Sequence, residues 1–130
     1  MRKLIMLALG GVLAATAPVH AKTAPDGEAK LAKALEGRVA GSPVDCVNMR
    51  NVRSTRIIDG VGILYDAGST VYLNRPRSGA ESLDKWDTLV TKLYSSQLCS
   101  IDTVHLYDTS SRMQTGFVFL GDFVPYRRAK

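Results

Sequence analysis

Residues 55–74 read TRIIDGVGILYDAGSTVYLN, three short apolar runs separated by two turn signals. The dipeptides Asp59-Gly60 and Gly68-Ser69 are typical of tight turns between antiparallel strands, because glycine adopts a positive φ without steric cost. The runs between and beside them are rich in β-branched and aromatic residues, which favour strands. The stretch therefore predicts two or three antiparallel strands between about Arg53 and Asn74.

The C-terminal half predicts further strands. Residues 99–108 (CSIDTVHLYD) and 116–120 (GFVFL) are each expected to form a strand, and the polar residues 109–112 predict the turn between them. Residues 123–126 are expected to pack the end of the domain, and the basic residues 127–130 to form an exposed tail.

Between the two strand regions lies the pattern of an amphipathic helix. Ser78 and Glu81 fit a capping box, in which each side chain accepts from the other residue's backbone amide. Apolar residues follow at helical spacing: Leu83, Trp86, Leu89, Val90 and Leu93. The pattern predicts a helix over 79–94, with Trp86 in the core.

A shorter helix is predicted nearer the N-terminus. Residues 28–36 (EAKLAKALE) are strong helix formers, and Gly37 can cap the helix at its C-terminal end. Residues 22–43 are thus expected to be an N-terminal helix and linker before a folded domain over 44–126. The predicted fold class is α+β: a small antiparallel sheet with one amphipathic helix, a short N-terminal helix and one disulfide.

Residues 1–21 have the composition of a secretory signal peptide. Arg2 and Lys3 precede a short apolar run, and Val19 and Ala21 lie at the −3 and −1 positions of a cleavage site. Cleavage would remove two of the 17 basic residues, which lowers the formal net charge from +5 to +3. We therefore predict a periplasmic or secreted protein with no membrane span after signal removal. Its positive charge is too low to indicate that nucleic acid is its partner.

The chain contains two cysteines, Cys46 and Cys99. Two cysteines in an exported chain are typical of one disulfide, and neither belongs to a Cys-x-x-Cys motif. Such a bridge closes a long loop and contributes roughly 4 kcal/mol of stability. We predict a Cys46–Cys99 disulfide with a structural role.

No set of residues gives a catalytic or metal site at the spacing that the chemistry requires. His105 is the single histidine after the signal, too few for zinc. On one strand Ser100 and Asp102 would face opposite to His105, which argues against a serine hydrolase triad. Local turns and a helix start account for nearly all of the aspartates that might act on a sugar: Asp59, Asp66, Asp84, Asp87, Asp102 and Asp122. We predict no cofactor and no metal.

Arg50, Arg53 and Arg56 recur at every third residue. Arginine holds phosphate and carboxylate oxygens with its planar fork, so these residues are candidates for an anion-binding site. On a strand they would alternate between faces, whereas a helical turn in this segment would gather them. The alternative is a solvated basic edge that discourages aggregation between strands.

Four segments together resemble a family of short exported proteobacterial proteins of unknown function: 46–59 (CVNMRNVRSTRIID), 71–74 (VYLN), 98–102 (LCSID) and 120–125 (LGDFVP). The resemblance covers 45–126 and implies export and a disulfide, but no activity. Some members carry two further cysteines, and the matching stretches 75–78 and 116–119 contain none. This difference argues against a redox role.

These patterns predict a non-enzymatic protein that binds or supports another component of the bacterial cell envelope, either an envelope protein or an anionic envelope ligand. One alternative is a small envelope hydrolase that uses His105. Another is an inhibitor or immunity-type protein that plugs an exported enzyme. The oligomeric state is left open.

Overall fold

The stretch 55–74 forms three consecutive antiparallel strands in the computed structural model, which describes residues 25–130. They are β3 (Ser54–Ile58), β4 (Gly62–Asp66) and β5 (Thr70–Asn74). Gly60 and Gly68 make the two turns with φ of 67° and 86°, a region that glycine enters easily. The prediction of antiparallel strands here is confirmed.

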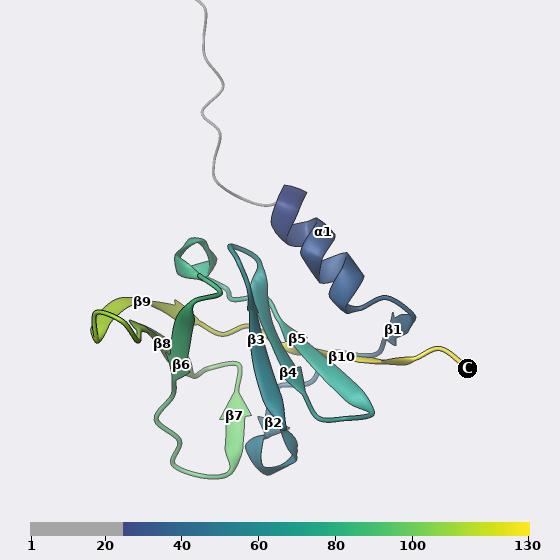
Figure 1. The fold of residues 1–130 in the computed structure, drawn as a ribbon. Coiled ribbons are helices and arrows are strands. Elements are labelled where there is room, and N and C mark those ends of the chain that lie inside the picture. The colour runs from purple at the N-terminus through teal and green to yellow at the C-terminus, as the bar shows by residue number, and fades with distance from the viewer. Residues whose placement is uncertain (1–24) are drawn as a thin grey trace, which may run out of the picture.

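Two more strands complete a five-stranded sheet in the order β1-β10-β5-β4-β3. They are β10 (Phe123–Arg128), which pairs with β5, and β1 (Arg38–Ala40), which pairs with β10. The helix α1 (Pro25–Ala34) lies beside this sheet in Figure 1, and it overlaps the predicted helical range 28–36. The strand β3 forms one edge of the sheet.

Successive side chains of a strand point to opposite faces of the sheet, and here the side chains on both faces are apolar. One face meets α1, where Leu31 and Leu35 are buried. The cluster also contains Val61 of the β3–β4 turn and four sheet residues, Ile58, Leu64, Val71 and Leu73. Burial of this apolar surface holds the helix to the sheet.

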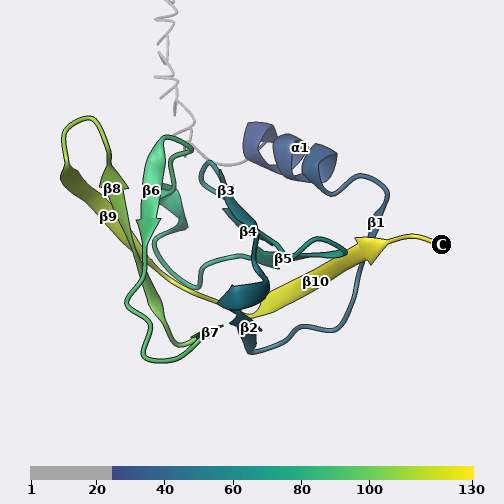
Figure 2. The ribbon, with the colours of Figure 1, turned by 60° about the horizontal axis from the view of Figure 1, so that its bottom comes forward.

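The opposite face meets two smaller antiparallel sheets. One has the order β6-β8-β9, formed by β6 (Asp87–Val90), β8 (Thr103–Asp108) and β9 (Met113–Phe119). The other pairs β2 (Cys46–Asn48) with β7 (Gln97–Cys99). Figure 2 shows how the three sheets are arranged. Residues from all three form the larger core, whose fully buried members include Ile63, Val104, Leu106, Val118, Leu120 and Phe123.

The predicted disulfide joins Cys46 and Cys99, which lie directly opposite each other in the β2–β7 pair. Each of these strands has only three residues, so few backbone hydrogen bonds hold the pair together. The covalent bond thus secures the smallest sheet of the fold.

The predicted amphipathic helix over 79–94 is wrong. Only a single 3₁₀ turn, η2 (Ala80–Ser82), forms at its start, and β6 occupies its middle. Trp86 is also misplaced by the prediction, because it is 76% exposed rather than in the core.

The local chemistry explains why strand replaces helix. Gly79 precedes η2 in the left-handed region, with φ of 86° and no side-chain cap. The Asp84 carboxylate then accepts from the Trp86 amide over 2.9 Å, a short-range bond that competes with helix. Thr88 and Val90 are β-branched, and β6 gains a ladder with β8. These effects outweigh the apolar spacing.

Smaller corrections concern element boundaries. The predicted linker contains β1, and the predicted tail contributes Arg127 and Arg128 to β10, where both are exposed. The run 99–108 is two strands, β7 and β8, separated by a turn at 100–102. Asp102 makes this turn by accepting from the Cys99 amide over 2.7 Å.

The predicted signal peptide, 1–21, lies outside the described residues. Within 25–130, no helix has the length and apolar character that a membrane crossing needs.

Candidate anion-binding site

Arg50 and Arg53 are gathered by a helical turn, which is the arrangement in which the sequence predicts a binding site. Arg50 lies in the 3₁₀ turn η1 (Met49–Asn51), and Arg53 lies just after it. The Asn48 side chain caps this turn by accepting from the Arg50 amide over 3.0 Å. The Val52 amide closes the turn by donating to the Met49 carbonyl over 3.2 Å.

The two arginines line a recess of about 470 Å³ at the surface. One wall comes from β2 and η1, and the other comes from the β4–β5 turn and the start of β5. The lining residues besides the arginines are Val47, Asn48, Asn51, Ala67, Ser69, Thr70 and Tyr72. None of them is a carboxylate, so the positive charge of the recess is not neutralised by its own walls.

Arg53 is held against the β4–β5 turn. Its backbone amide donates to the Asp66 carbonyl over 2.7 Å. Its guanidinium lies over Gly68, where an added Cβ would be only 3.1 Å from the Arg53 Cζ. Gly68 therefore serves both the turn, through its positive φ, and the close approach of the arginine.

The charge of both arginines is available to a ligand. Among residues 25–130, the ion pairs are Lys30–Asp59 and Arg75–Glu28, and neither involves Arg50 or Arg53. Arg38 adds positive charge nearby, since its guanidinium donates to the Ser69 carbonyl over 3.3 Å. Amide, hydroxyl and guanidinium groups around a recess can hold a phosphate or carboxylate through charge-assisted hydrogen bonds.

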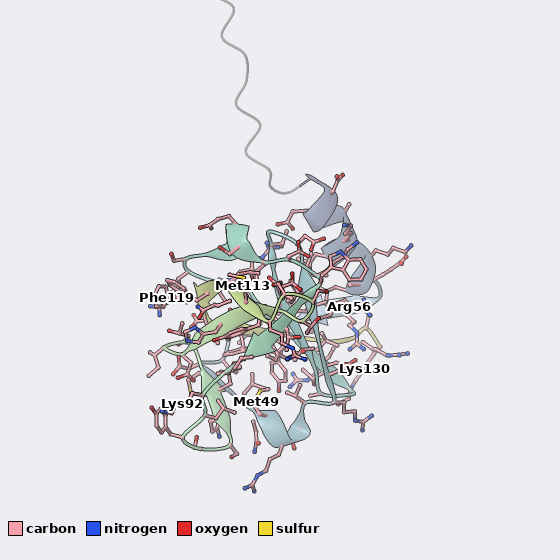
Figure 3. All side chains as sticks on the ribbon, turned by 60° about the vertical axis from the view of Figure 1, so that its left-hand side comes forward. Met49, Arg56, Lys92, Met113, Phe119 and Lys130 are labelled. Atoms are coloured by element: carbon pink, nitrogen blue, oxygen red, sulfur yellow. A yellow bond between two sulfur atoms is a disulfide. The ribbon has the colours of Figure 1, made fainter. Side chains whose placement is uncertain are left out.

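Arg56 does not belong to this recess, which corrects the prediction of one patch of three arginines. It lies on β3 opposite Leu64, a residue of the cluster under α1. It lines a different groove, with Lys30 and Lys33 of α1. In Figure 3, Arg56 is separated from Met49, the first residue of η1.

The three residues of the serine hydrolase triad that the sequence argues against each contact other groups, and His105, the residue of the hydrolase alternative, has no carboxylate partner among residues 25–130. The Ser100 hydroxyl donates to the Asp45 carboxylate, and the Asp102 carboxylate accepts from the Cys99 amide. The His105 ring contacts the Gln114 amide nitrogen, with 3.2 Å between that nitrogen and Nδ1. No carboxylate of the described chain pairs with His105.

His105 lies instead on an uncharged aromatic face of the three-stranded sheet. Its ring centroid is 6.3 Å from that of Phe117, which packs edge-on against Phe119 at 5.5 Å. Across residues 25–130, no group of three histidine, cysteine, aspartate or glutamate side chains could hold a metal ion. Both cysteines are in the disulfide.

Sequence reasoning missed the second wall of the recess, formed by Ala67, Ser69, Thr70 and Tyr72. The turn at Gly68-Ser69 was visible, but its closeness to Arg53 depends on how β3 enters the sheet. Only the pairing of Ser54 with Asp66 brings residue 53 next to this turn.

Comparisons with protein families, with curated proteins and with solved structures give no match to this chain. The resemblance to a family of short exported proteins stays a prediction.

Proposed function

We propose that this chain is a non-enzymatic binding protein of the bacterial cell envelope, and that it holds an anionic group of an envelope component in the Arg50–Arg53 recess. The observation that carries the proposal is a surface recess with two arginines and no carboxylate among its lining residues. Fixed guanidinium groups recognise the planar or tetrahedral oxygens of carboxylate and phosphate.

The envelope location is supported by the sequence of residues 1–21, which has the order of a signal peptide. A single disulfide in the described chain suits an oxidising compartment. Export is tested by cell fractionation of the full-length chain beside a variant that begins at Lys22. The full-length chain should reach the periplasm or medium, and the variant should stay in the cytoplasm.

The binding site is tested by calorimetric titration of the exported, disulfide-bonded protein with inorganic phosphate. The double variant Arg50→Gln/Arg53→Gln should bind phosphate at least tenfold more weakly, because each charge-assisted hydrogen bond contributes about 1.5–3 kcal/mol. The matched control, Arg112→Gln/Lys130→Gln, removes the same charge from two exposed residues that do not line the recess, and should keep the parent affinity. Equal losses in both variants would refute a local site.

A second pair of variants tests the placement of Arg53. Gly68→Ala strains the turn and crowds the guanidinium, whereas Gly37→Ala strains a similar positive φ of 73° with no heavy atom within 4 Å of the added Cβ. Both should lose about 1 kcal/mol of stability. Only Gly68→Ala should weaken phosphate binding, and an unchanged affinity there would contradict the assigned position of Arg53.

A further inference from the structure

A second basic groove lies between α1 and β3, on the other face of the sheet from the larger core. Its volume is about 660 Å³. Four cations and one carboxylate line it together with three apolar residues: Lys30, Lys33, Arg56 and Lys85 with Asp59, and Ala34, Ile57 and Ile58. The cations come from three separate segments of the chain, so only the fold brings them together.

The single carboxylate of the groove is occupied by structural contacts. One oxygen of Asp59 lies 3.4 Å from the Lys30 ammonium nitrogen, and the other accepts from the Lys85 backbone amide over 2.6 Å. Asp59 thus ties α1 to the loop before β6. Among the described residues, the side chains of Lys33, Arg56 and Lys85 form no ion pair and are exposed.

An exposed tryptophan stands at the end of this groove. Trp86 is 76% exposed, and the Lys85 ammonium nitrogen lies 4.9 Å from the centre of its ring. Trp86 lines an adjoining recess that shares Asp59 and Lys85 with the groove. Glu81 and Asp84 also line that recess, so the basic face ends there. Indole favours the boundary between the polar and apolar layers of a bilayer.

We propose that this face docks the protein on an anionic lipid bilayer. The three unpaired cations contact lipid phosphates, and Trp86 enters the headgroup layer beside them. A bilayer fits better than a small soluble anion, because cations spread over an open groove need several phosphates at once and the indole needs an apolar layer.

The proposal depends on the envelope location proposed above, where such a bilayer is within reach. It uses different residues from the Arg50–Arg53 recess. The two sites can therefore fail independently: phosphate titration reports on the recess, and vesicle binding reports on the groove.

The test uses the exported protein and two kinds of vesicle, phosphatidylcholine alone and an equal mixture of phosphatidylcholine and phosphatidylglycerol. Trp86 is the only tryptophan of the chain, so its fluorescence reports on this face alone. The protein should sediment with the anionic vesicles only. Its emission should shift to the blue, and lipids brominated near the headgroup should quench it.

Variants locate the docking face. Each basic residue near an anionic surface raises partitioning roughly fivefold, so Lys33→Gln/Arg56→Gln/Lys85→Gln should lower it on the order of 100-fold. The control Arg127→Gln/Arg128→Gln/Lys130→Gln removes the same charge and should bind as the parent does. Circular dichroism checks that both variants fold.

Three results would overturn the proposal. The first is failure to sediment with anionic vesicles. The second is sedimentation with unchanged Trp86 emission, which would mean contact through another face. Equal losses in the two triple variants would show attraction by net charge only. The recess variant Arg50→Gln/Arg53→Gln should bind anionic vesicles at least as strongly as the control triple variant does.

Discussion

The two basic sites of this molecule carry similar charge but are held in place by different means. The Arg50–Arg53 recess is built on η1, directly after β2, the strand that the disulfide fixes to β7. The groove between α1 and β3 depends on a helix attached through Leu31, Leu35 and two surface ion pairs. The recess therefore has covalent support, whereas the groove depends on packing.

This difference predicts which substitutions should disrupt each site. Removal of the disulfide threatens the whole domain, because the bridge constrains residues far apart in the chain. Removal of a buried contact under α1 threatens the groove first, because a short helix at one side can separate locally while the sheets stay folded. Three changes test this contrast, in order of decreasing effect.

The largest effect is expected from Cys46→Ala/Cys99→Ala. The two cysteines are 53 residues apart, and loss of this loop closure should cost about 4 kcal/mol of unfolding free energy. Urea unfolding followed by circular dichroism measures the loss. As a control, Ser100→Ala removes the bond to Asp45 beside the bridge but keeps the bridge, and should lose far less. A disulfide variant as stable as the parent would contradict the structural role.

An intermediate effect is expected from Leu31→Ala. This side chain is 3% exposed in the cluster under α1, and its truncation should cost about 2–4 kcal/mol. Amide hydrogen exchange should rise in α1 well before it rises in β4. Binding to anionic vesicles should weaken, and the affinity of the recess for phosphate should equal that of the parent. The control Ala32→Ser changes an exposed residue of the same helix and should alter none of these. Equal exchange in α1 and β4 would show that the helix does not separate locally.

The smallest effect concerns the pair between Glu28 of α1 and Arg75 after β5. Two nitrogens of the Arg75 guanidinium donate to the two carboxylate oxygens over 2.6 and 3.0 Å. These hydrogen bonds lower the pKa of Glu28 from its usual 4.5. Both side chains are about half exposed, so Glu28→Gln should cost only about 0.5 kcal/mol at neutral pH.

The pH dependence of this cost follows from the direction of the shift. A carboxylate with a lowered pKa in the fold contributes stability above its unfolded pKa, and loses it as pH falls through the lower folded value. The stability difference between parent and Glu28→Gln should thus be constant near neutrality, begin to shrink as pH falls through 4.5, and vanish below the lowered pKa of Glu28 in the folded protein. A difference that grows in acid would contradict the pair.

The strands around the first turns were predictable because local signals and tertiary pairing agree there. The apolar runs of residues 55–74 are buried almost without interruption in β4 and β5, and glycine occupies both turn positions that require positive φ. The helix over 79–94 failed because apolar spacing alone cannot show that Thr88 and Val90 will find β8 as a partner. Short strands such as β1 and β2 carry too few residues to give a pattern.

The candidate site was half predictable for the same reason. The arginine spacing identified Arg50 and Arg53, and the local cap by Asn48 decides that they gather. The separation of Arg56 depends on which face of β3 meets α1, which is set by distant residues such as Leu31. The closeness of Gly68 to Arg53 likewise depends on strand register, which no local signal gives.

The most direct test of the central claim is to map phosphate binding on the protein by amide chemical shifts, with the disulfide intact. The account predicts saturable shifts at Asn51, Arg53 and Ser69, which meet at the recess, and smaller ones at Lys33 and Lys85. Shifts that do not saturate, or that are largest at the groove or elsewhere, would contradict an anion-binding recess at Arg50 and Arg53.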